Sequence, residues 1–394
     1  MKSIKNKIIK NICIVGAGNV GHYLMALLGT NKDINIDVLT SNADYFNSYI
    51  ESLNTHTGEI TVGKLNKVST NPKDVIPSAD MILFTVPRNI CSYYLEKIYD
   101  YTTVGTFIGF IPGSGGVEFL SQKFILNKNC IVFGSQRVPS GTKLVKRGKI
   151  VNSLGNRKDM RIAALNPTYT KPLCEFFEKT IGIKTIALPN YISVTFVPSN
   201  QILHTSRLYG LFHNYKDGDE WDSRLSFYRK WDDFSSDILL SCDAELQQCC
   251  NSLSKFDLKG VLSLKEHYEI TNIVGKTDVE RMTKKICSLD YLKDNVPMCK
   301  NTNGKYIPDF NSRYFQEDFP YGLCILRSFI NVCIGASPTI DIILKWYSKV
   351  MKKEYYIKDV FCGKDLRNLP ILQNYGIHSV EEIYEYYEKI SGNQ

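Results

Sequence analysis

One short glycine-rich segment constrains the fold of this chain more than any other feature. The apolar run at residues 11–15 leads directly into Gly16-Ala17-Gly18-Asn19-Val20-Gly21, a G-x-G-x-x-G pattern, and helix-forming residues follow. An apolar strand that stops at glycine and turns into a helix is typical of a parallel sheet. In that setting the three glycines allow a tight turn, a close approach of the backbone to a pyrophosphate and close helix packing, and the helix N-terminus attracts phosphate. The sequence therefore predicts that residues 16–21 bind NAD or NADP.

The first half of the chain alternates short apolar runs with helical patterns, which predicts an α/β fold with an open, doubly wound parallel sheet of the Rossmann type. The strands are expected at residues 11–15, 36–39, 81–86, 106–111, 130–133 and 184–188, and helices at residues 21–29 and 89–98.

The second half has a different pattern. Apolar residues recur there at spacings of three and four, and alternating β patterns are scarce, so this half is expected to be mainly helical. The clearest helical segments are residues 234–253, 279–289, 321–333 and 338–351. With the boundary placed near residues 188–191, we expect a dinucleotide-binding domain at 1–189 and a helical substrate and catalytic domain at 190–394.

Composition excludes several classes of protein. The 394 residues are 43% hydrophobic and 22% charged, which is ordinary for a globular protein and argues against disorder. The lysine-rich start lacks the long apolar region of a signal peptide and no apolar run could span a membrane, so a cytoplasmic location is expected. The 12 cysteines form no C-x-x-C pair, so reduced, mostly buried thiols and no metal site are expected.

The net charge of +8 lies in the first half of the chain, which suits a phosphate-bearing partner. Nucleic acid is not expected to be that partner, because basic and aromatic residues are not interleaved. The expected partners are small molecules, and the sequence leaves a homodimer open.

The residues after the second strand bear on the choice of dinucleotide. An acidic residue at the tip of that strand would bind the ribose hydroxyl of NAD and repel the extra phosphate of NADP. The tip instead has Thr40, Ser41 and Asn42, while Asp37 lies within the strand and Asp44 lies beyond it. Hydroxyl groups can receive a phosphate, although no arginine is adjacent, so we predict contacts from Thr40 and Ser41 and a slight preference for NADP.

Two further loops follow predicted strands at the edge of the sheet where ligands bind. The segment 85–88 includes Val86 and Pro87, which we assign to the cofactor site. The segment 111–116 contains a Pro-Gly-Ser-Gly-Gly turn with Ser114, and such a turn can either approach a nicotinamide closely or act only as a turn.

His204 is the best candidate for acid–base chemistry. It lies just after the predicted boundary, and an imidazole can exchange a proton near neutral pH. A buried histidine bonded only to backbone is the alternative. An acid–base histidine needs a carboxylate to fix its tautomer, and the segment 311–323 supplies Glu317 and Asp318 beside Arg313. We expect an extended backbone at these carboxylates, because Pro320 follows closely; a helix start that is merely acidic is the alternative.

Taken together, these motifs resemble those of the octopine/nopaline dehydrogenase family over roughly residues 8–350. The resemblance is carried by the phosphate loop, the turn at 111–116, Asn200-x-x-x-His204 with the segment 207–210, and Arg313 with Glu317-Asp318-x-Pro320-x-Gly322-Leu323. It implies a Rossmann domain followed by a helical domain, with the active site between them. It also implies an oxidoreductase acting on CH–NH bonds, an opine dehydrogenase that uses NAD(P)H to condense an α-keto acid reductively with an amino acid through an imine.

The resemblance also implies residue roles. His204 matches the family's acid–base residue, Asp318 its carboxylate partner and Arg313 its carboxylate-binding arginine. We assign Asn200, Tyr209 and Ser114 to substrate binding as well, although Ser114 stands where some members have glutamine.

Beside Tyr209, the aromatic residues Trp221 and Trp231 and the acidic segment 217–222 could form an amino-acid pocket. A solvated acidic loop and aromatic core packing are the alternative.

Two other functions remain open at this point. A ketopantoate or hydroxyacid reductase would share the two-domain plan but uses a lysine, and residues 200–210 contain none. A non-catalytic NAD(P) sensor would tolerate the loss of His204, whereas an enzyme would not.

Overall fold

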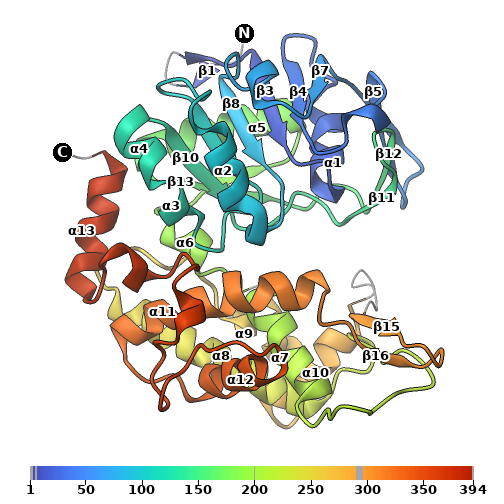
Figure 1. Ribbon diagram of the computed structural model, residues 1–394, viewed down its shortest axis with the longest axis vertical. Coiled ribbons are helices and arrows are strands. Elements are labelled where there is room, and N and C mark those ends of the chain that lie inside the picture. Colours follow the sequence, from blue (N-terminus) through green and yellow to red (C-terminus); the bar gives the residue numbers. More distant parts are fainter. Residues whose placement is uncertain (1–2, 5–6, 199, 290–295, 393–394) are drawn as a thin grey trace. The chain divides into compact units, whose positions relative to one another are not determined.

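The computed structural model describes residues 3–4, 7–198, 200–289 and 296–392. It contains two compact units, Met1–Thr195 with Tyr384–Gln394, and Phe196–Ile383 (Figure 1). The lysine-rich start used to predict the location lies partly outside the described residues.

An eight-stranded sheet forms the centre of the first unit. Its strands, in spatial order, are β14 (Thr185–Ala187), β13 (Met160–Ala164), β10 (Ile131–Ser135), β9 (Phe107–Phe110), β8 (Met81–Phe84), β3 (Asn11–Val15), β4 (Asn35–Leu39) and β7 (Lys67–Ser69). The chain moves outward from β3 in both directions, and β3 pairs in parallel with β4 and β8. The phosphate loop therefore lies at the point where the strand order reverses, which is where such sheets bind ligands.

The predicted Rossmann-type sheet is confirmed, and β3 shows why its sequence was informative. Ile12, Cys13, Ile14 and Val15 are all fully buried, so both faces of this strand are covered. The expectation of a wholly parallel sheet was wrong, because β13 pairs antiparallel with β10.

A second, four-stranded sheet in the first unit was not predicted. Its order is β11 (Thr142–Lys146), β12 (Ile150–Ser153), β5 (Tyr49–Asn54) and β6 (Ile60–Lys64). Several of its strands lie beside α1 (Asn19–Leu28) in Figure 1. The approach to α1 is close, because a Cβ at Gly63 would lie 2.3 Å from the carbonyl oxygen of Met25.

The other helices of the first unit are short or connect the strands. They are α2 (Cys91–Tyr99), α3 (Val117–Leu120), α4 (Gln122–Lys128), α5 (Thr170–Ile181) and α6 (Ile192–Thr195). Helices α1 and α2 occupy the segments where helices were predicted.

The second unit is mainly helical, as predicted. Its helices are α7 (Asn200–Phe212), α8 (Asp233–Ser252), α9 (Leu264–His267), α10 (Asp278–Cys287), α11 (Cys324–Cys333) and α12 (Pro338–Val350), and a π-helix spans Tyr314–Leu323. A small hairpin of β15 (Met298–Lys300) and β16 (Tyr306–Pro308) is added. Helix α7 packs against both α8 and the π-helix, so three segments distant in sequence meet at α7.

The division into units differs from the predicted boundary at residues 189 and 190. The first unit continues to Thr195, and α13 (Val380–Ser391) returns to it from Tyr384 onward. Glu118 explains the difference, since its carboxylate accepts hydrogen bonds from Thr195 at 2.5 Å and from Tyr387 at 3.0 Å. Burial raises the pKa of Glu118 to about 7. These tertiary contacts leave no local signal in the sequence.

Two predictions from composition can be compared with the structure. The 12 cysteines are all free thiols and most are buried, as predicted. Within the described part of the chain, no helix is long and apolar enough to cross a membrane.

Candidate active site

The phosphate loop has backbone geometry that only glycine satisfies at two positions. Gly16 has a φ of +106°, and a Cβ there would lie 2.6 Å from the side chain of Val86. At Gly21 a Cβ would lie 2.2 Å from the carbonyl oxygen of Gly16. The first glycine therefore makes the turn, and the last brings α1 against the loop, as the motif predicts.

Gly18 has a different role, because a Cβ there would meet nothing within 4 Å. It precedes the first residue of α1 and has no side chain to cap the helix, so the first N–H groups of α1 lack acceptors within the helix. The first turn also carries no acidic side chain. Open space before an uncapped helix N-terminus fits the pyrophosphate of a dinucleotide.

Neighbouring residues hold the loop in place. The side-chain oxygen of Asn19 accepts a hydrogen bond from the N–H of Leu144 in β11 at 2.8 Å. His22 is fully buried; its Nδ1 donates to the carbonyl of Gly18 at 3.0 Å, and its Nε2 accepts from the N–H of Gly148 at 2.7 Å. Burial lowers the pKa of His22, so the neutral ring with its proton on Nδ1 is favoured.

Ala17 and Val20 complete the predicted phosphate loop. Ala17 is buried, and Val20 is partly buried and packs against the core of the sheet. Their side chains contribute packing, which leaves phosphate contacts to the backbone.

At the tip of β4, Thr40 is buried and Ser41 and Asn42 are exposed. Asp37 lies within the strand, where it accepts a hydrogen bond from Asn66 at 2.8 Å and burial raises its pKa. Asp44 lies in the turn beyond. Hydroxyl and amide groups thus occupy the position where a carboxylate would select NAD.

The two other predicted loops of the first unit are linked. Val86 packs beside Gly16, and Pro87 begins the turn that carries Arg88. The buried guanidinium of Arg88 donates to the carbonyl of Pro112, so it joins this loop to the turn that contains the partly buried Ser114.

In the second unit, the structure brings His204 and Asp318 together. Nδ1 of His204 lies 2.8 Å from Oδ2 of Asp318, although α7 and the π-helix are far apart in sequence. Both side chains are largely buried, at 10% and 14% exposed. A carboxylate oxygen accepts a hydrogen bond, so the ring proton lies on Nδ1 and Nε2 faces the opposite side of the imidazole.

Aromatic residues surround this pair. The hydroxyl of Tyr228 lies 3.0 Å from Nε2 of His204, and the rings of Phe227 and Tyr314 lie 5.6 and 4.6 Å from the imidazole. Burial, with a smaller effect from the charge of Asp318, raises the pKa of Tyr314 to about 12. An imidazolium at this position would gain cation–π stabilisation from these rings.

The π-helix corrects one prediction. Glu317 and Asp318 are not in extended backbone before Pro320, because Tyr314–Leu323 form a π-helix that contains this proline. A π-helix bonds over five residues rather than four, and such turns are rare and frequent at functional sites. The sequence effect of proline on the preceding residue was outweighed by packing of this segment on α7.

Arg313 precedes the π-helix and has an exposed side chain, at 65%. Its Nε lies 2.6 Å from Oε2 of Glu317, which is one turn further along and only 12% exposed. The guanidinium of Arg313 therefore places a permanent positive charge beside Glu317, the residue before Asp318.

The predicted site residues on α7 lie in different surroundings. Asn200 is exposed at the start of the helix. Tyr209 packs its ring against His213, Phe234 and Trp346, and burial raises its pKa. At about 100° per residue, Tyr209 lies on another face of the helix from His204. Its ring has a packing role, and its substrate contact stays a prediction.

The acidic segment 217–222 is an exposed loop, where Asp222 pairs with Lys305. Trp221 packs on Phe212, and Trp231 packs parallel to Tyr228. These surroundings match the second of the two interpretations given above, a solvated acidic loop beside aromatic residues packed in the core. The segment therefore lends no support to an amino-acid pocket.

The chain is similar to known proteins in sequence and in fold. Residues 187–351 match the family model of the NAD/NADP octopine/nopaline dehydrogenase alpha-helical domain. The tauropine dehydrogenase of Arabella iricolor is 27% identical, and the match covers 94% of this chain and 99% of that protein.

Solved structures show the same fold. An octopine dehydrogenase solved with NADH and L-arginine superposes with a TM-score of 0.82 at 21% identity, covering 98% of each chain. A structure with NADH and pyruvate gives a TM-score of 0.80 at 21% identity, covering 95% of this chain and 98% of that one. The chain is thus similar to the octopine/nopaline dehydrogenases in its helical domain, and it shares the fold of octopine dehydrogenase.

Proposed function

We propose that this protein is an NAD(P)H-dependent opine dehydrogenase. It condenses the amino group of an amino acid with an α-keto acid and reduces the resulting imine, reversibly, to a secondary-amine dicarboxylate. The contact between His204 and Asp318 at 2.8 Å carries the proposal, because it supplies an oriented acid–base group in a chain with a dinucleotide loop.

His204 acts first on the condensation. The amine adds to the keto carbon to give a carbinolamine, whose oxygen must be protonated before it leaves as water. With Nδ1 committed to Asp318, the proton reaches the substrate from the Nε2 side. The carboxylate stabilises the imidazolium before transfer and fixes the tautomer after it. Help of this kind is worth roughly 10²–10⁴-fold in rate.

The first unit would hold the dinucleotide, with Gly16, Gly18 and Gly21 shaping the loop and the N-terminus of α1 available to receive the phosphates. When bound, the reduced nicotinamide supplies the hydride that converts the imine carbon to an amine carbon.

Arg313 is proposed to bind a substrate carboxylate. Its planar fork can hold two carboxylate oxygens, and its side chain is exposed. Glu317 occupies Nε without a substrate, so a bound carboxylate would use the terminal nitrogens or displace Glu317. In both cases the substrate carboxylate is held by Arg313 close in sequence to Asp318, which follows Glu317 in the π-helix.

The substrates proposed are a pyruvate-like keto acid and an amino acid. Support comes from the relatives, since octopine dehydrogenase has been solved with L-arginine and with pyruvate. Asn200 and Ser114 are further proposed substrate contacts.

The cofactor is proposed to be NAD or NADP, with a slight preference for NADP. Ser41 and Asn42 are exposed and uncharged at the tip of β4, and Asp37 is already bonded to Asn66. A 2′-phosphate would therefore meet hydroxyl and amide groups rather than a carboxylate.

A coupled absorbance assay tests the function. Purified protein is mixed with NADH or NADPH and a matrix of keto acids and amino acids, and loss of the reduced-nicotinamide band is followed. We expect oxidation only when both a keto acid and an amine are present, with a secondary amine identified by mass spectrometry.

Two results would contradict the proposal. Oxidation with a keto acid alone, at the same rate with or without amine, would indicate a hydroxyacid reductase. Cofactor binding without turnover across the matrix would indicate a sensor.

A further inference from the structure

We propose that Tyr228 is a catalytic residue whose hydroxyl transfers the proton between Nε2 of His204 and the oxygen of the substrate. The inference rests on the proposed function and adds a group to it. Tyr228 is 6% exposed, and its hydroxyl lies 3.0 Å from Nε2, on the side of the ring opposite Asp318. The imidazole is thus hydrogen-bonded through Nδ1 to a carboxylate and through Nε2 to a phenol.

This contact poses a mechanistic question, because the nitrogen that must reach the substrate already has a partner. Either the substrate displaces the hydroxyl, or the hydroxyl lies between the nitrogen and the substrate. The answer depends on how firmly the segment around Tyr228 is held.

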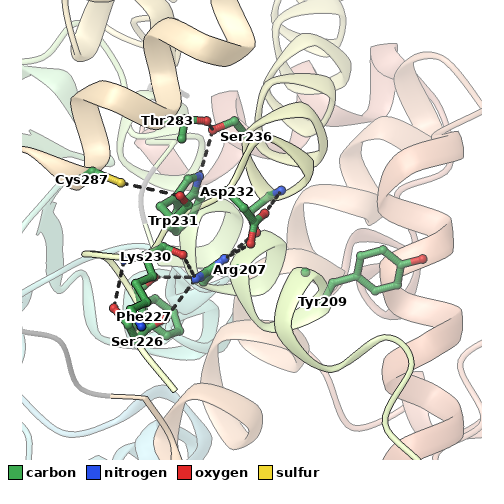
Figure 2. Close-up of polar contacts among 12 residues, drawn as sticks. Arg207, Tyr209, Ser226, Phe227, Lys230, Trp231, Asp232, Ser236, Thr283 and Cys287 are labelled. Carbon is green, nitrogen blue, oxygen red and sulfur yellow. Dashed lines mark hydrogen bonds and ion pairs between the residues drawn. The ribbon is translucent and has the colours of Figure 1, made fainter. Parts of the chain in front are cut away.

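Arg207 holds that segment (Figure 2). Its guanidinium is 1% exposed and donates to three backbone carbonyls on both sides of Tyr228: Phe227 at 2.8 Å, Ser226 at 3.0 Å, and Lys230. Arginine presents its donors in one rigid plane, so these carbonyls are fixed relative to each other. Arg207 also lies on α7, three residues after His204, so the same helix carries the base and the anchor.

The anchor continues into α8. Arg207 pairs with Asp232 and donates to Ser235 at 2.9 Å, and Asp232 caps α8 by accepting from the N–H of Ser235 at 2.7 Å. Burial opposes ionisation of Asp232, but the bonds from Ser235 and the charge of Arg207 outweigh it and lower the pKa. The guanidinium therefore keeps its charged partner, and the segment cannot shift without breaking the start of α8.

Trp231 restrains Tyr228 from the side. The two rings are nearly parallel, with 7° between their planes, and the indole N–H donates to Ser236 at 2.9 Å. Ser236 in turn contacts Thr283 of α10 at 2.7 Å (Figure 2). With backbone and ring both restrained, displacement of the phenol is unfavourable, and we infer that it stays between His204 and the substrate.

The phenol proton passes to the carbinolamine oxygen as its C–O bond breaks, and the lone pair of the substrate nitrogen forms the C=N bond. The Nε2 proton passes to the oxygen of Tyr228. The imidazolium becomes neutral, the phenol stays neutral, water leaves and the positive charge resides on the iminium. Hydration of the iminium reverses each transfer.

The test is the variant Tyr228→Phe, which removes one oxygen and keeps the packed ring. We expect kcat to fall by about 10–10²-fold, which reaches only the lower end of the roughly 10²–10⁴-fold range for acid–base groups, with KM values and cofactor affinity nearly unchanged. The matched control is Tyr356→Phe, which removes a hydroxyl bonded to Asp341 at 2.6 Å in the same unit and should leave kcat unchanged.

The outcomes separate this proposal from the proposed function. If the wild-type protein turns over keto acid and amine but Tyr228→Phe loses less than about tenfold in kcat, or loses no more than Tyr356→Phe, the proposal for Tyr228 is wrong and the function stands. An increase in KM alone would likewise refute it. If the wild-type protein has no such turnover, the proposed function is at fault.

A second variant tests the positioning role of Arg207. Arg207→Lys keeps a charge but loses the planar fork, and folding is checked by circular dichroism. We expect folded Arg207→Lys to have a lower kcat than the wild-type protein. The double variant Arg207→Lys with Tyr228→Phe should have the same kcat as Tyr228→Phe alone. An equal additional loss in the double variant would refute the link, because Arg207 would then act independently of Tyr228.

Discussion

The two buried histidines of this protein differ in the partners of their ring nitrogens. His22 in the first unit is bonded to backbone groups, the carbonyl of Gly18 and the N–H of Gly148. His204 in the second unit is bonded to the carboxylate of Asp318 and the hydroxyl of Tyr228. Both are buried on helices that follow loops, and burial alone does not separate them.

The partners determine which protonation states each ring can adopt. A backbone N–H only donates, so protonating Nε2 of His22 would set two N–H groups against each other. A hydroxyl both donates and accepts, so Nε2 of His204 keeps its partner with or without a proton. His22 is therefore a structural group that holds the phosphate loop, and His204 is suited to proton exchange.

The largest expected effect is on turnover. His204→Ala should reduce kcat by roughly 10²–10⁴-fold, because the acid–base group is lost. Cofactor affinity should stay close to that of the wild-type protein, since the loop around Gly18 belongs to the other unit. Steady-state rates and a fluorescence titration with NADH check both parts. If His204→Ala keeps most of the wild-type turnover, the assignment of acid–base chemistry to His204 and not to His22 is wrong.

A smaller effect is expected on cofactor binding. Gly18→Val places a side chain in the open space before α1 without a clash inside the protein. Crowding of this kind costs about 1–3 kcal/mol, which corresponds to a Kd for NADH about 10–10²-fold higher. The Kd is measured by titration calorimetry. Gly21→Ala is the contrast, because its Cβ would lie 2.2 Å from the Gly16 carbonyl oxygen, so it should destabilise the fold. Unchanged NADH affinity in Gly18→Val would contradict the assigned phosphate site.

His22→Leu should affect stability more than chemistry. It leaves the Gly148 N–H without its present partner, at a cost of about 1–3 kcal/mol, while the Gly18 carbonyl keeps its hydrogen bond from the backbone N–H of residue 22. Denaturant unfolding measures the loss, and His56→Ala, at an exposed histidine, is the control. We expect the folded variant to retain kcat at saturating cofactor. A loss of kcat as large as that of His204→Ala would contradict the comparison.

The smallest expected effect concerns pH. The pKa of His22 is lowered by burial, so below its ordinary value of 6.5 the unfolded chain binds more protons than the folded one. The contribution of His22 to stability is present above pH 6.5 and is lost as the pH falls through the folded pKa. Unfolding free energies measured between pH 7 and 5 should therefore decline less steeply in His22→Leu. If the unfolding free energy depends on pH with the same slope in the wild-type protein and in His22→Leu, His22 is not held neutral in the folded state.

The parts of the fold that were predicted depend on local signals. The strand–glycine–helix segment at residues 11–28 combines burial on both faces of β3, a positive φ at Gly16 and a helix start at Asn19. Each feature restricts residue types nearby in sequence. The second sheet had no such signal, because β11 is mostly exposed and β5 buries few side chains.

The candidate site was predictable only in part. The motif around His204 and Asp318 identified two residues that the structure brings together. Tyr228 was missed because its link to His204 is a contact between segments, and Arg207 because its acceptors are backbone carbonyls that any residue provides. The packing of Tyr209 could not be predicted, because proximity in sequence to His204 does not place a residue on the same face of α7.

The most direct test of the central claim, that His204 and Asp318 act as one acid–base unit, is a double-mutant cycle on kcat/KM. His204→Ala, Asp318→Asn and the double variant are compared with the wild-type protein under the same keto acid, amine and cofactor. Groups that act together give strongly non-additive losses. We predict that the double variant is no slower than His204→Ala. Losses that multiply in the double variant would contradict the account, because the imidazole and the carboxylate would then contribute independently.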